Sequence, residues 1–247
     1  MIHKEKIKQA YDGLADLYFE TRIKGGSSQF FNEMLEMPRT LRMLGNVKSK
    51  KILDLGCGPG RYAHILTDKN AKIVGIDNSI NSLKIAEKEA PEAKFVLGDI
   101  EKLPFKSAEF NIVFSSLVLG HFEKWDKIFS EVRRVLKRNG IFIFSIHNPI
   151  RETLEKEKWF FRTFREIKNY FKERILQDNW AKGGRSFPIF HHHKTYGTII
   201  RYIASNGFEL IDYEDCKPLP KANKKYPKLY NQAINTPYFC VWKLRKK

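Results

Sequence analysis

Residues 51–61 read Lys51-Ile52-Leu53-Asp54-Leu55-Gly56-Cys57-Gly58-Pro59-Gly60-Arg61. The apolar residues at the start of this stretch predict a strand that is buried on both faces, as in a parallel sheet. Three glycines at alternate positions follow, and a helical pattern begins directly after them. Glycine tolerates positive φ and lets a ligand approach the backbone closely, while the start of a helix offers free N–H groups. The stretch therefore predicts a strand, a tight turn and a helix that together hold a nucleotide-like ligand.

The spacing of these glycines argues against a dinucleotide site. The pattern G-x-G-x-x-G would require glycine at position 61, where the chain has Arg61. A nicotinamide-dependent dehydrogenase is therefore disfavoured. The pattern that is present, Asp54-x-Gly56-x-Gly58-x-Gly60, resembles motif I of the class I S-adenosylmethionine (SAM)-dependent methyltransferases.

This resemblance implies that SAM is the cofactor and S-adenosylhomocysteine the by-product. The methionine carboxylate of SAM would meet the N–H groups near Gly58, and Asp54 would hold the amino group of SAM or the turn itself. The residues expected to form the cofactor-binding turn are Gly56, Cys57, Gly58 and Gly60.

Apolar strands alternate with helical patterns on both sides of this stretch. Further strands are expected at 71–77, 94–99, 110–116, 141–146, 208–213 and 238–244. Such alternation predicts an α/β fold with a parallel sheet covered by helices on both faces. The resemblance implies a Rossmann-like, seven-stranded, mostly parallel sheet of order 3-2-1-4-5-7-6, in which the last strand is antiparallel.

Acidic residues end two of the expected strands. Ligands of open parallel sheets bind beyond the carboxyl ends of the strands, where Asp77, followed by Asn78, could accept both ribose hydroxyls. Residues 98–105 resemble the family motif G-D-x-x-x-L-P-F, which implies that Asp99 contacts the adenine amino group and that the N–H of Ile100 meets the ring. The alternative is that each aspartate only forms a turn or caps a helix.

Two further segments are expected to contact SAM. Ser115, Ser116 and Leu117 end the fourth strand and would lie beside the sulfonium and the transferred methyl group. Residues 11–18 resemble the family opening Y-D-x-x-A-x-x-Y, in which a helix folds over the cofactor and the second tyrosine, here Tyr18, touches it. The alternative is that both tyrosines pack in the core.

Histidines are the candidates for catalysis. Methyl transfer from SAM is an in-line displacement that mainly requires alignment, and a general base is needed only if the acceptor keeps its proton at neutral pH. His121 follows the fourth strand, where the family often has a histidine near the methyl group, and His147 ends the fifth strand. His193 opens a stretch that resembles a family segment near the substrate mouth. An ordinary hydrogen-bonding role is the alternative for each.

The run His191-His192-His193 does not predict a metal site. Consecutive residues of an extended segment point to opposite faces, so three adjacent histidines do not converge on one ion. We therefore expect no metal.

The segment 149–190 breaks the alternation of strands and helices. Phe160, Phe164, Ile167 and Phe171 recur at helical spacing. This predicts an amphipathic helix that forms a lid over the substrate, with 183–184 (Gly-Gly) as a hinge, or an extra helix docked on the core. Seven aromatic residues between 159 and 180 favour a small apolar or aromatic acceptor.

The length of 247 residues suits one methyltransferase domain. Its expected parts are an N-terminal helical cover (1–45), the SAM-binding core (46–148), the helical lid (149–190) and a C-terminal helix with two strands (191–247). No apolar run has the length of a membrane span, and the N-terminus has no apolar signal core. Three scattered cysteines suit a reducing compartment. The expected location is the cytoplasm.

The chain carries 45 basic and 28 acidic side chains, a formal net charge of +17. An RNA base methyltransferase is therefore one alternative, but the lysines are scattered, and the last strand lacks the Asp-Asn-Trp ending expected of wobble-uridine tRNA enzymes. A SAM-binding regulatory protein without catalysis is another. The favoured partner is a small-molecule acceptor. The sequence indicates no oligomeric state.

Overall fold

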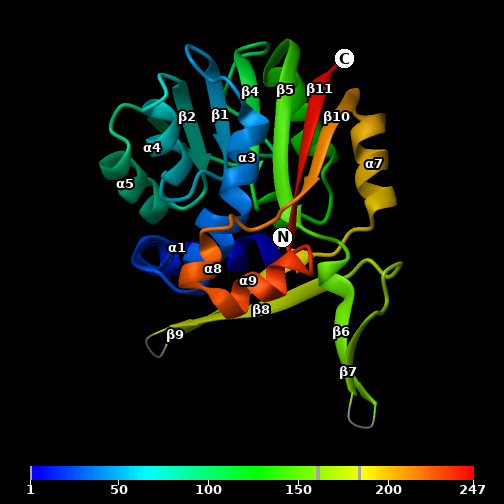
Figure 1. Cartoon of the computed structure of the whole chain (residues 1–247). Coiled ribbons are helices and arrows are strands. Elements are labelled where there is room, and N and C mark those ends of the chain that lie inside the picture. Colours follow the sequence, from blue (N-terminus) through cyan, green and yellow to red (C-terminus); the bar gives the residue numbers. More distant parts are fainter. Residues whose placement is uncertain (1, 160–161, 183–184) are drawn as a thin grey trace.

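The computed structural model describes residues 2–159, 162–182 and 185–247 (Figure 1). Its centre is a seven-stranded sheet in the order β3-β2-β1-β4-β5-β11-β10. The strands are β1 (Lys51–Leu55), β2 (Lys72–Asp77), β3 (Lys94–Leu97), β4 (Phe110–Ser116), β5 (Leu136–His147), β10 (Phe208–Asp215) and β11 (Phe239–Lys246).

The pairing follows the predicted topology. Neighbours from β3 to β5 pair in parallel, and β11 pairs antiparallel with both β5 and β10. The expected order 3-2-1-4-5-7-6, with the last strand antiparallel, is confirmed. Because β1 lies between β2 and β4, the direction of winding changes at β1, and this is where an open α/β sheet forms a crevice.

Helices cover both faces of the sheet (Figure 1). Ile52 of β1 packs into one core with α3 (Met37–Leu44) and α4 (Arg61–Thr67), whereas Leu53 packs into a second core with α6 (Asp126–Val135) and α7 (Tyr196–Ser205). Alternate residues of β1 thus enter opposite cores, so the near-continuous apolar strand in the sequence follows directly from burial on both sides. α5 (Ile80–Glu89) follows β2 and begins at Ser79, whose Oγ accepts a hydrogen bond from the N–H of Ser82.

The carboxyl ends of the parallel strands are covered by other elements (Figure 1). These are α1 (Ile2–Lys24), α2 (Ser27–Gln29), the π-helix η1 (Phe30–Glu36), α8 (Ala222–Lys225) and α9 (Pro227–Ile234). No helix within the described ranges combines the length and the apolar character that are needed to cross a bilayer.

The prediction of an amphipathic helix within 149–190 is wrong. The described strands of this segment form two antiparallel pairs, β6 (Leu154–Trp159) with β7 (Arg162–Ile167) and β8 (Ile175–Lys182) with β9 (Arg185–His192). Of the residues that suggested the helix, Phe164 and Ile167 belong to β7, and Phe171 lies between the hairpins with 90% of its surface exposed. Aromatic and β-branched residues suit strands, so the same residues satisfy a strand. Phe160 and the proposed hinge at 183–184 lie outside the described residues.

Candidate functional site

A cavity of about 1320 Å³ lies at the carboxyl ends of β1, β2 and β4. Its walls come from α1, the glycine turn, the ends of β2 and β4, and the insertion. The predicted site residues that line it are Tyr18, Asp54, Gly56, Cys57, Gly58, Asp77, Asn78, Asp99, Ile100, Ser116, Leu117 and His121. Gly60, Ser115 and His193 are not among the described residues that line it.

Gly58 and Gly60 of the turn are needed for different reasons. Gly56, Gly58 and Gly60 have φ values of 70°, 50° and 79°. A Cβ on Gly58 would meet no described atom within 4 Å, so its backbone is open to the cavity. A Cβ on Gly60 would lie 2.9 Å from the Cα of Ala86, so Gly60 is required for the close packing of α4 on α5 and does not serve the cavity.

Asp54 is a buried carboxylate on the cavity wall. Only 2% of its surface is exposed, and its Oδ2 finds no hydrogen-bond partner among the described residues. Burial raises the pKa of Asp54 well above its ordinary value of 3.8, and the nearby Asp77 carboxylate raises it further. An unpaired buried oxygen is costly, so this position fits a ligand that brings a cationic donor.

The other two acids also meet the cavity, and both carry backbone contacts. Asp77 Oδ2 accepts a hydrogen bond of 2.8 Å from the N–H of Gly58, and its Oδ1 accepts one of 2.9 Å from Ser79. Burial raises the pKa of Asp77, although these backbone donors oppose the rise. Asp99 Oδ1 accepts a hydrogen bond of 2.9 Å from the N–H of Glu101. Each oxygen of the Asp77 carboxylate has two lone pairs, so its two bonds leave acceptor capacity for a ligand.

Helix α1 closes the cavity and brings residues that no motif indicated. The hydroxyl of Tyr18 donates to Asn32 Oδ1 at 3.4 Å, and Arg22 Nη1 donates to the same hydroxyl at 3.3 Å. Arg22 is 6% exposed and also pairs with Glu33 Oε1 at 3.0 Å. Arg22 and Asn32 both line the cavity. They come together only through the packing of α1 on η1, so no local sequence signal marks them.

The two serines at the end of β4 are placed differently. Ser115 is fully buried and its Oγ donates to the carbonyl of Leu55 at 3.1 Å, so it joins two strands and does not face the cavity. Ser116 and Leu117 do line it. Adjacent residues of a strand point to opposite faces, so Ser115 and Ser116 could not both have reached the ligand.

Glu36 of η1 stabilises the floor of the cavity. No motif in the sequence indicated this residue. This fully buried side chain accepts hydrogen bonds from four hydroxyl groups, those of Thr40, Tyr62, Ser116 and Ser145. These bonds join the N-terminal cover to α4, β4 and β5.

His121 lies on the one-turn helix η2 (Leu119–His121) and faces the cavity. Its Nδ1 is 2.6 Å from the carbonyl oxygen of Phe190, and its Nε2 is 2.9 Å from the hydroxyl of Tyr11. A carbonyl only accepts, so Nδ1 carries the proton and Nε2 accepts from Tyr11. Burial lowers the pKa of His121 below its ordinary value of 6.5, which keeps this neutral form.

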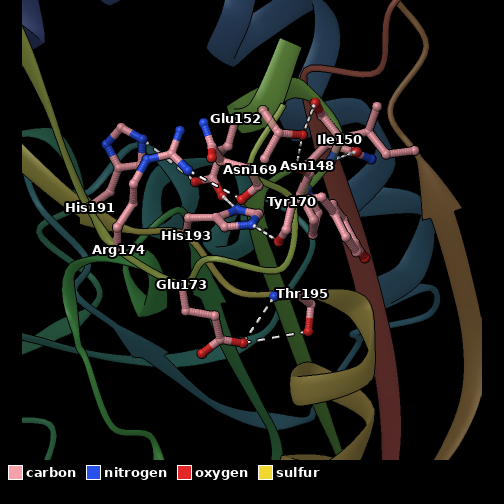
Figure 2. Close-up of polar contacts among 12 residues, drawn as sticks. Asn148, Ile150, Glu152, Asn169, Tyr170, Glu173, Arg174, His191, His193 and Thr195 are labelled. Atoms are coloured by element: carbon pink, nitrogen blue, oxygen red, sulfur yellow. Dashed lines mark hydrogen bonds and ion pairs between the residues drawn. The ribbon is translucent and has the colours of Figure 1, made fainter. Parts of the chain in front are cut away.

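His193 takes a different role from the one predicted. Its side chain is 0% exposed, its Nδ1 is 2.8 Å from Glu152 Oε2, and its Nε2 is 2.8 Å from the carbonyl oxygen of Tyr170 (Figure 2). Burial lowers the pKa of His193, but the hydrogen bonds to Glu152 and Tyr170 outweigh it, and the net change is a rise. Both ring nitrogens are engaged, so His193 positions Glu152 and does not reach the cavity.

Three side chains from separate elements meet at the insertion. They are His147 at the end of β5, Glu152 on the one-turn helix η3 (Arg151–Thr153), and His191 on β9, and their ligand atoms lie within 4.8 Å of one another. Burial lowers the pKa of His147 well below 6.5 and that of His191 to about 4, while burial raises the pKa of Glu152 to about 7. His147 and Glu152 are distant in sequence from His191, so the spacing of the histidine run does not indicate this cluster.

Known proteins resemble this chain in sequence and in fold. Residues 53–144 match a family model described as a methyltransferase domain. The chain is 30% identical to an uncharacterized protein of Haemophilus influenzae over 95% of both chains. It is 35% identical to the demethylmenaquinone methyltransferase of Thermotoga maritima over 41% of this chain and 45% of that protein. The crystal structure of an S-adenosylmethionine-dependent methyltransferase from Mesorhizobium loti superposes with a TM-score of 0.71 and 26% identity, over 85% of this chain and 96% of that one.

Proposed function

Because this chain belongs to the class I SAM-dependent methyltransferases, we propose that its cavity binds SAM along the carboxyl ends of β1, β2 and β4 and transfers the methyl group to a small-molecule acceptor at the insertion. The observation that carries this proposal is Asp54, which lines the same cavity as Asp77 and Asp99 and whose buried Oδ2 has no hydrogen-bond partner within the described chain. A cavity of about 1320 Å³ has room for both molecules.

We assign the two ends of SAM from the polar groups that face the cavity. Asp54 would pair with the methionine ammonium, and the backbone at Gly58, which is open to the cavity, would admit the methionine carboxylate. Asp77 would accept from the ribose hydroxyls, and Asp99 with Ile100 would hold adenine. Tyr18 and Asn78, which also line the cavity, complete this contact surface.

The proposed reaction is an in-line displacement. SAM supplies a methyl group on a positively charged sulfur, so the chain has to align the acceptor with that methyl group and exclude water. Ser116 and Leu117 lie where the sulfonium is expected. His121 lines the cavity in its neutral form, and it is the candidate base for an acceptor that must lose a proton. The single lone pair of Nε2 accepts from the Tyr11 hydroxyl, so this hydroxyl would have to give way to the bound acceptor.

The residues at the acceptor end of the cavity favour a small aromatic methyl acceptor that carries a polar group. Of the aromatic residues between 159 and 180, the structure describes the side chains of only Tyr170 and Phe171, and neither lines the cavity. The aromatic wall is instead formed by Phe31, Tyr238 and Phe239, with ring centroids of Phe31 and Tyr238 4.9 Å apart. His147 lies 5.3 Å from the Phe239 ring and adds the polar side.

Calorimetry with SAM and with S-adenosylhomocysteine tests the cofactor site. Asp77→Ala should weaken SAM binding by about 1–3 kcal/mol, roughly 5- to 150-fold, because charge-assisted hydrogen bonds to the ribose are lost. Unchanged affinity in this variant would contradict the ribose role of Asp77.

Turnover of methyl-labelled SAM on fractionated small-molecule extract and on total RNA tests the reaction. Label should pass to a small molecule. SAM binding without turnover on any fraction would favour a regulatory protein. Label on RNA, together with an RNA affinity that falls steeply with salt, would favour the RNA enzyme.

A further inference from the structure

The acceptor end of the cavity contains a cluster of side chains that methyl transfer from SAM does not require. His147, Glu152 and His191 each bring one ligand atom to a common point, from β5, η3 and β9. Residues 147, 152 and 191 all line the cavity that holds the proposed SAM site. His147 is beyond Ser145, which pairs with Ser116 of β4, so the cluster lies next to the strand end where the transferred methyl group is expected.

The donor set is one that transition metals use. Two imidazoles and one carboxylate form the open type of zinc site, which keeps a position for water or substrate. The described ligand atoms lie within 4.8 Å of one another, and around a tetrahedral zinc ion with Zn–N bonds of about 2.0–2.1 Å they would be roughly 3.3 Å apart. Glu152 Oε1 and His191 Nε2 are already 3.5 Å apart, close to this separation. His191 is 5% exposed, and its Nδ1 has no hydrogen-bond partner in the part of the chain that the structure describes.

Surrounding residues orient the carboxylate of Glu152 (Figure 2). The ring of His193 holds Glu152 Oε2 at 2.8 Å and is itself held by the Tyr170 carbonyl, which leaves Oε1 facing His191 Nε2 at 3.5 Å. Oδ2 of a second acid, Asp178, lies 3.7 Å from His191 Nδ1, and this carboxylate adds negative charge on the cavity side of the cluster. Outer partners of this kind fix the ligands of functional metal sites.

We propose that His147, Glu152 and His191 bind one divalent transition-metal ion, for which zinc is the best match, and that this ion holds the methyl acceptor. This rests on the proposed methyl transfer, which it deepens. The acceptor class that follows is a small molecule with an ionisable hydroxyl or thiol. Its oxygen or sulfur would coordinate the ion and lose its proton to solvent, since a metal ion lowers the pKa of a bound donor. With the ion bound, the acceptor would not need His121 as a base. The anion then forms a bond to the methyl carbon as the carbon–sulfur bond of SAM breaks, which leaves neutral S-adenosylhomocysteine.

Metal binding can be measured without turnover. The full chain is freed of metal with a chelator and titrated with Zn²⁺ in competition with a fluorescent zinc indicator, and with Co²⁺ followed by its visible absorption. One ion per chain is expected, with a Co²⁺ spectrum of low coordination number. His147→Ala and His191→Ala should each weaken Zn²⁺ binding by more than His193→Gln, for which a loss of roughly 10- to 100-fold is expected.

His192→Ala is the matched control, because it removes the neighbouring imidazole of the same run but lies outside the cluster; it should leave Zn²⁺ affinity unchanged. SAM affinity is measured by calorimetry on every variant and should not change, which also shows that each variant folds. Failure of the wild-type chain to bind one Zn²⁺ at micromolar concentration would overturn the metal site. So would equal affinity in wild type, His147→Ala and His191→Ala. If the wild-type chain does not bind SAM, the proposed function is overturned, while the Zn²⁺ titrations still decide the metal site.

Discussion

The buried carboxylate of Asp54 lowers the stability of the ligand-free fold, and the same carboxylate is the proposed partner of the SAM ammonium. Its Oδ2 is buried, and nothing in the described ranges donates a hydrogen bond to it. Because the folded-state pKa of Asp54 is raised, its contribution to stability is fully present below the ordinary pKa of 3.8 and is lost as pH rises through the folded-state pKa.

Asp54→Asn should therefore raise the Tm of the ligand-free protein at neutral pH, and the gain should shrink toward pH 4. The same variant should lose most of the Tm increase that SAM gives to the wild type. Thermal denaturation across pH, with and without SAM, checks both effects. A variant that is less stable than wild type at neutral pH and still gains the full Tm increase from SAM would contradict this account.

The glycine turn offers a matched pair of substitutions. Gly60→Ala should lower the free energy of unfolding by about 1–3 kcal/mol, because the new methyl group meets the Ala86 backbone and φ is positive. Gly58→Val should abolish SAM binding, because its side chain extends into the cavity from a position with no described atom nearby, and its own positive φ of 50° should also lower stability. Calorimetry with SAM, under conditions where urea denaturation shows both variants to be folded, separates the two roles. Equal loss of SAM affinity in folded Gly60→Ala would refute the distinction.

His121→Ala tests the candidate base. If Nε2 accepts the proton of the acceptor, kcat should fall by roughly 10²- to 10⁴-fold while the Kd for SAM changes little. Kinetics with an identified acceptor and calorimetry with SAM measure the two quantities. Equal loss of turnover and affinity would indicate that His121, held between Tyr11 and Phe190, only supports the cavity wall.

Part of the site could be predicted from single residues in the sequence. The glycine motif, Asp77 and Asp99 are local signals at strand ends, and the parallel topology brings them into one cavity. Which of Ser115 and Ser116 points toward the cavity depends on strand register, and the local sequence does not determine the register. Glu36 and Glu152 act through contacts with residues far along the chain, so a search for motifs misses them.

The insertion shows how a pattern can suit two elements. The spacing of Phe164, Ile167 and Phe171 matches a helix, but β7 contains the first two and pairs with β6 over its whole length. Lys182 pairs with Arg185 across the two glycines at 183–184, and Gly-Gly between two strand-like runs is a hairpin signal. The hairpin signal was therefore present in the sequence, and the helical spacing of the aromatic residues obscured it.

The hairpin of β8 and β9 supports the cover over SAM. Ile189 of β9 is 7% exposed and packs with Ala10 and Leu14 of α1. Ile189→Ala should destabilise the protein by about 2–4 kcal/mol, and because Tyr18 lies on the same helix it should also weaken SAM binding. Hydrogen exchange of residues 10–24 should increase in this variant. Unchanged exchange there would show that α1 is held without the hairpin.

At the scale of the whole molecule, the sheet was the most predictable feature. Alternation of apolar strands and helices is repeated along most of the chain, so each element supports the prediction for the next. Binding should stabilise the fold as a unit: at a SAM concentration of 100 times Kd, the free energy of unfolding should rise by about 2.7 kcal/mol. Chemical denaturation at a series of SAM concentrations measures this rise, and an increase that does not follow the calorimetric Kd would contradict a single site in the folded state.

The antiparallel strand β11 has a consequence for synthesis of the chain. It lies between β5 and β10, and its residues Phe239–Lys246 come from the last part of the sequence. Until residues 239–246 have been synthesised, β10 has no partner strand in the sheet and one edge of β5 is unpaired. Both strands can then pair with a strand of another nascent chain. Completion of the sheet therefore waits for translation to reach β11. Nascent chains stalled before residue 239 should need a chaperone to remain free of aggregates.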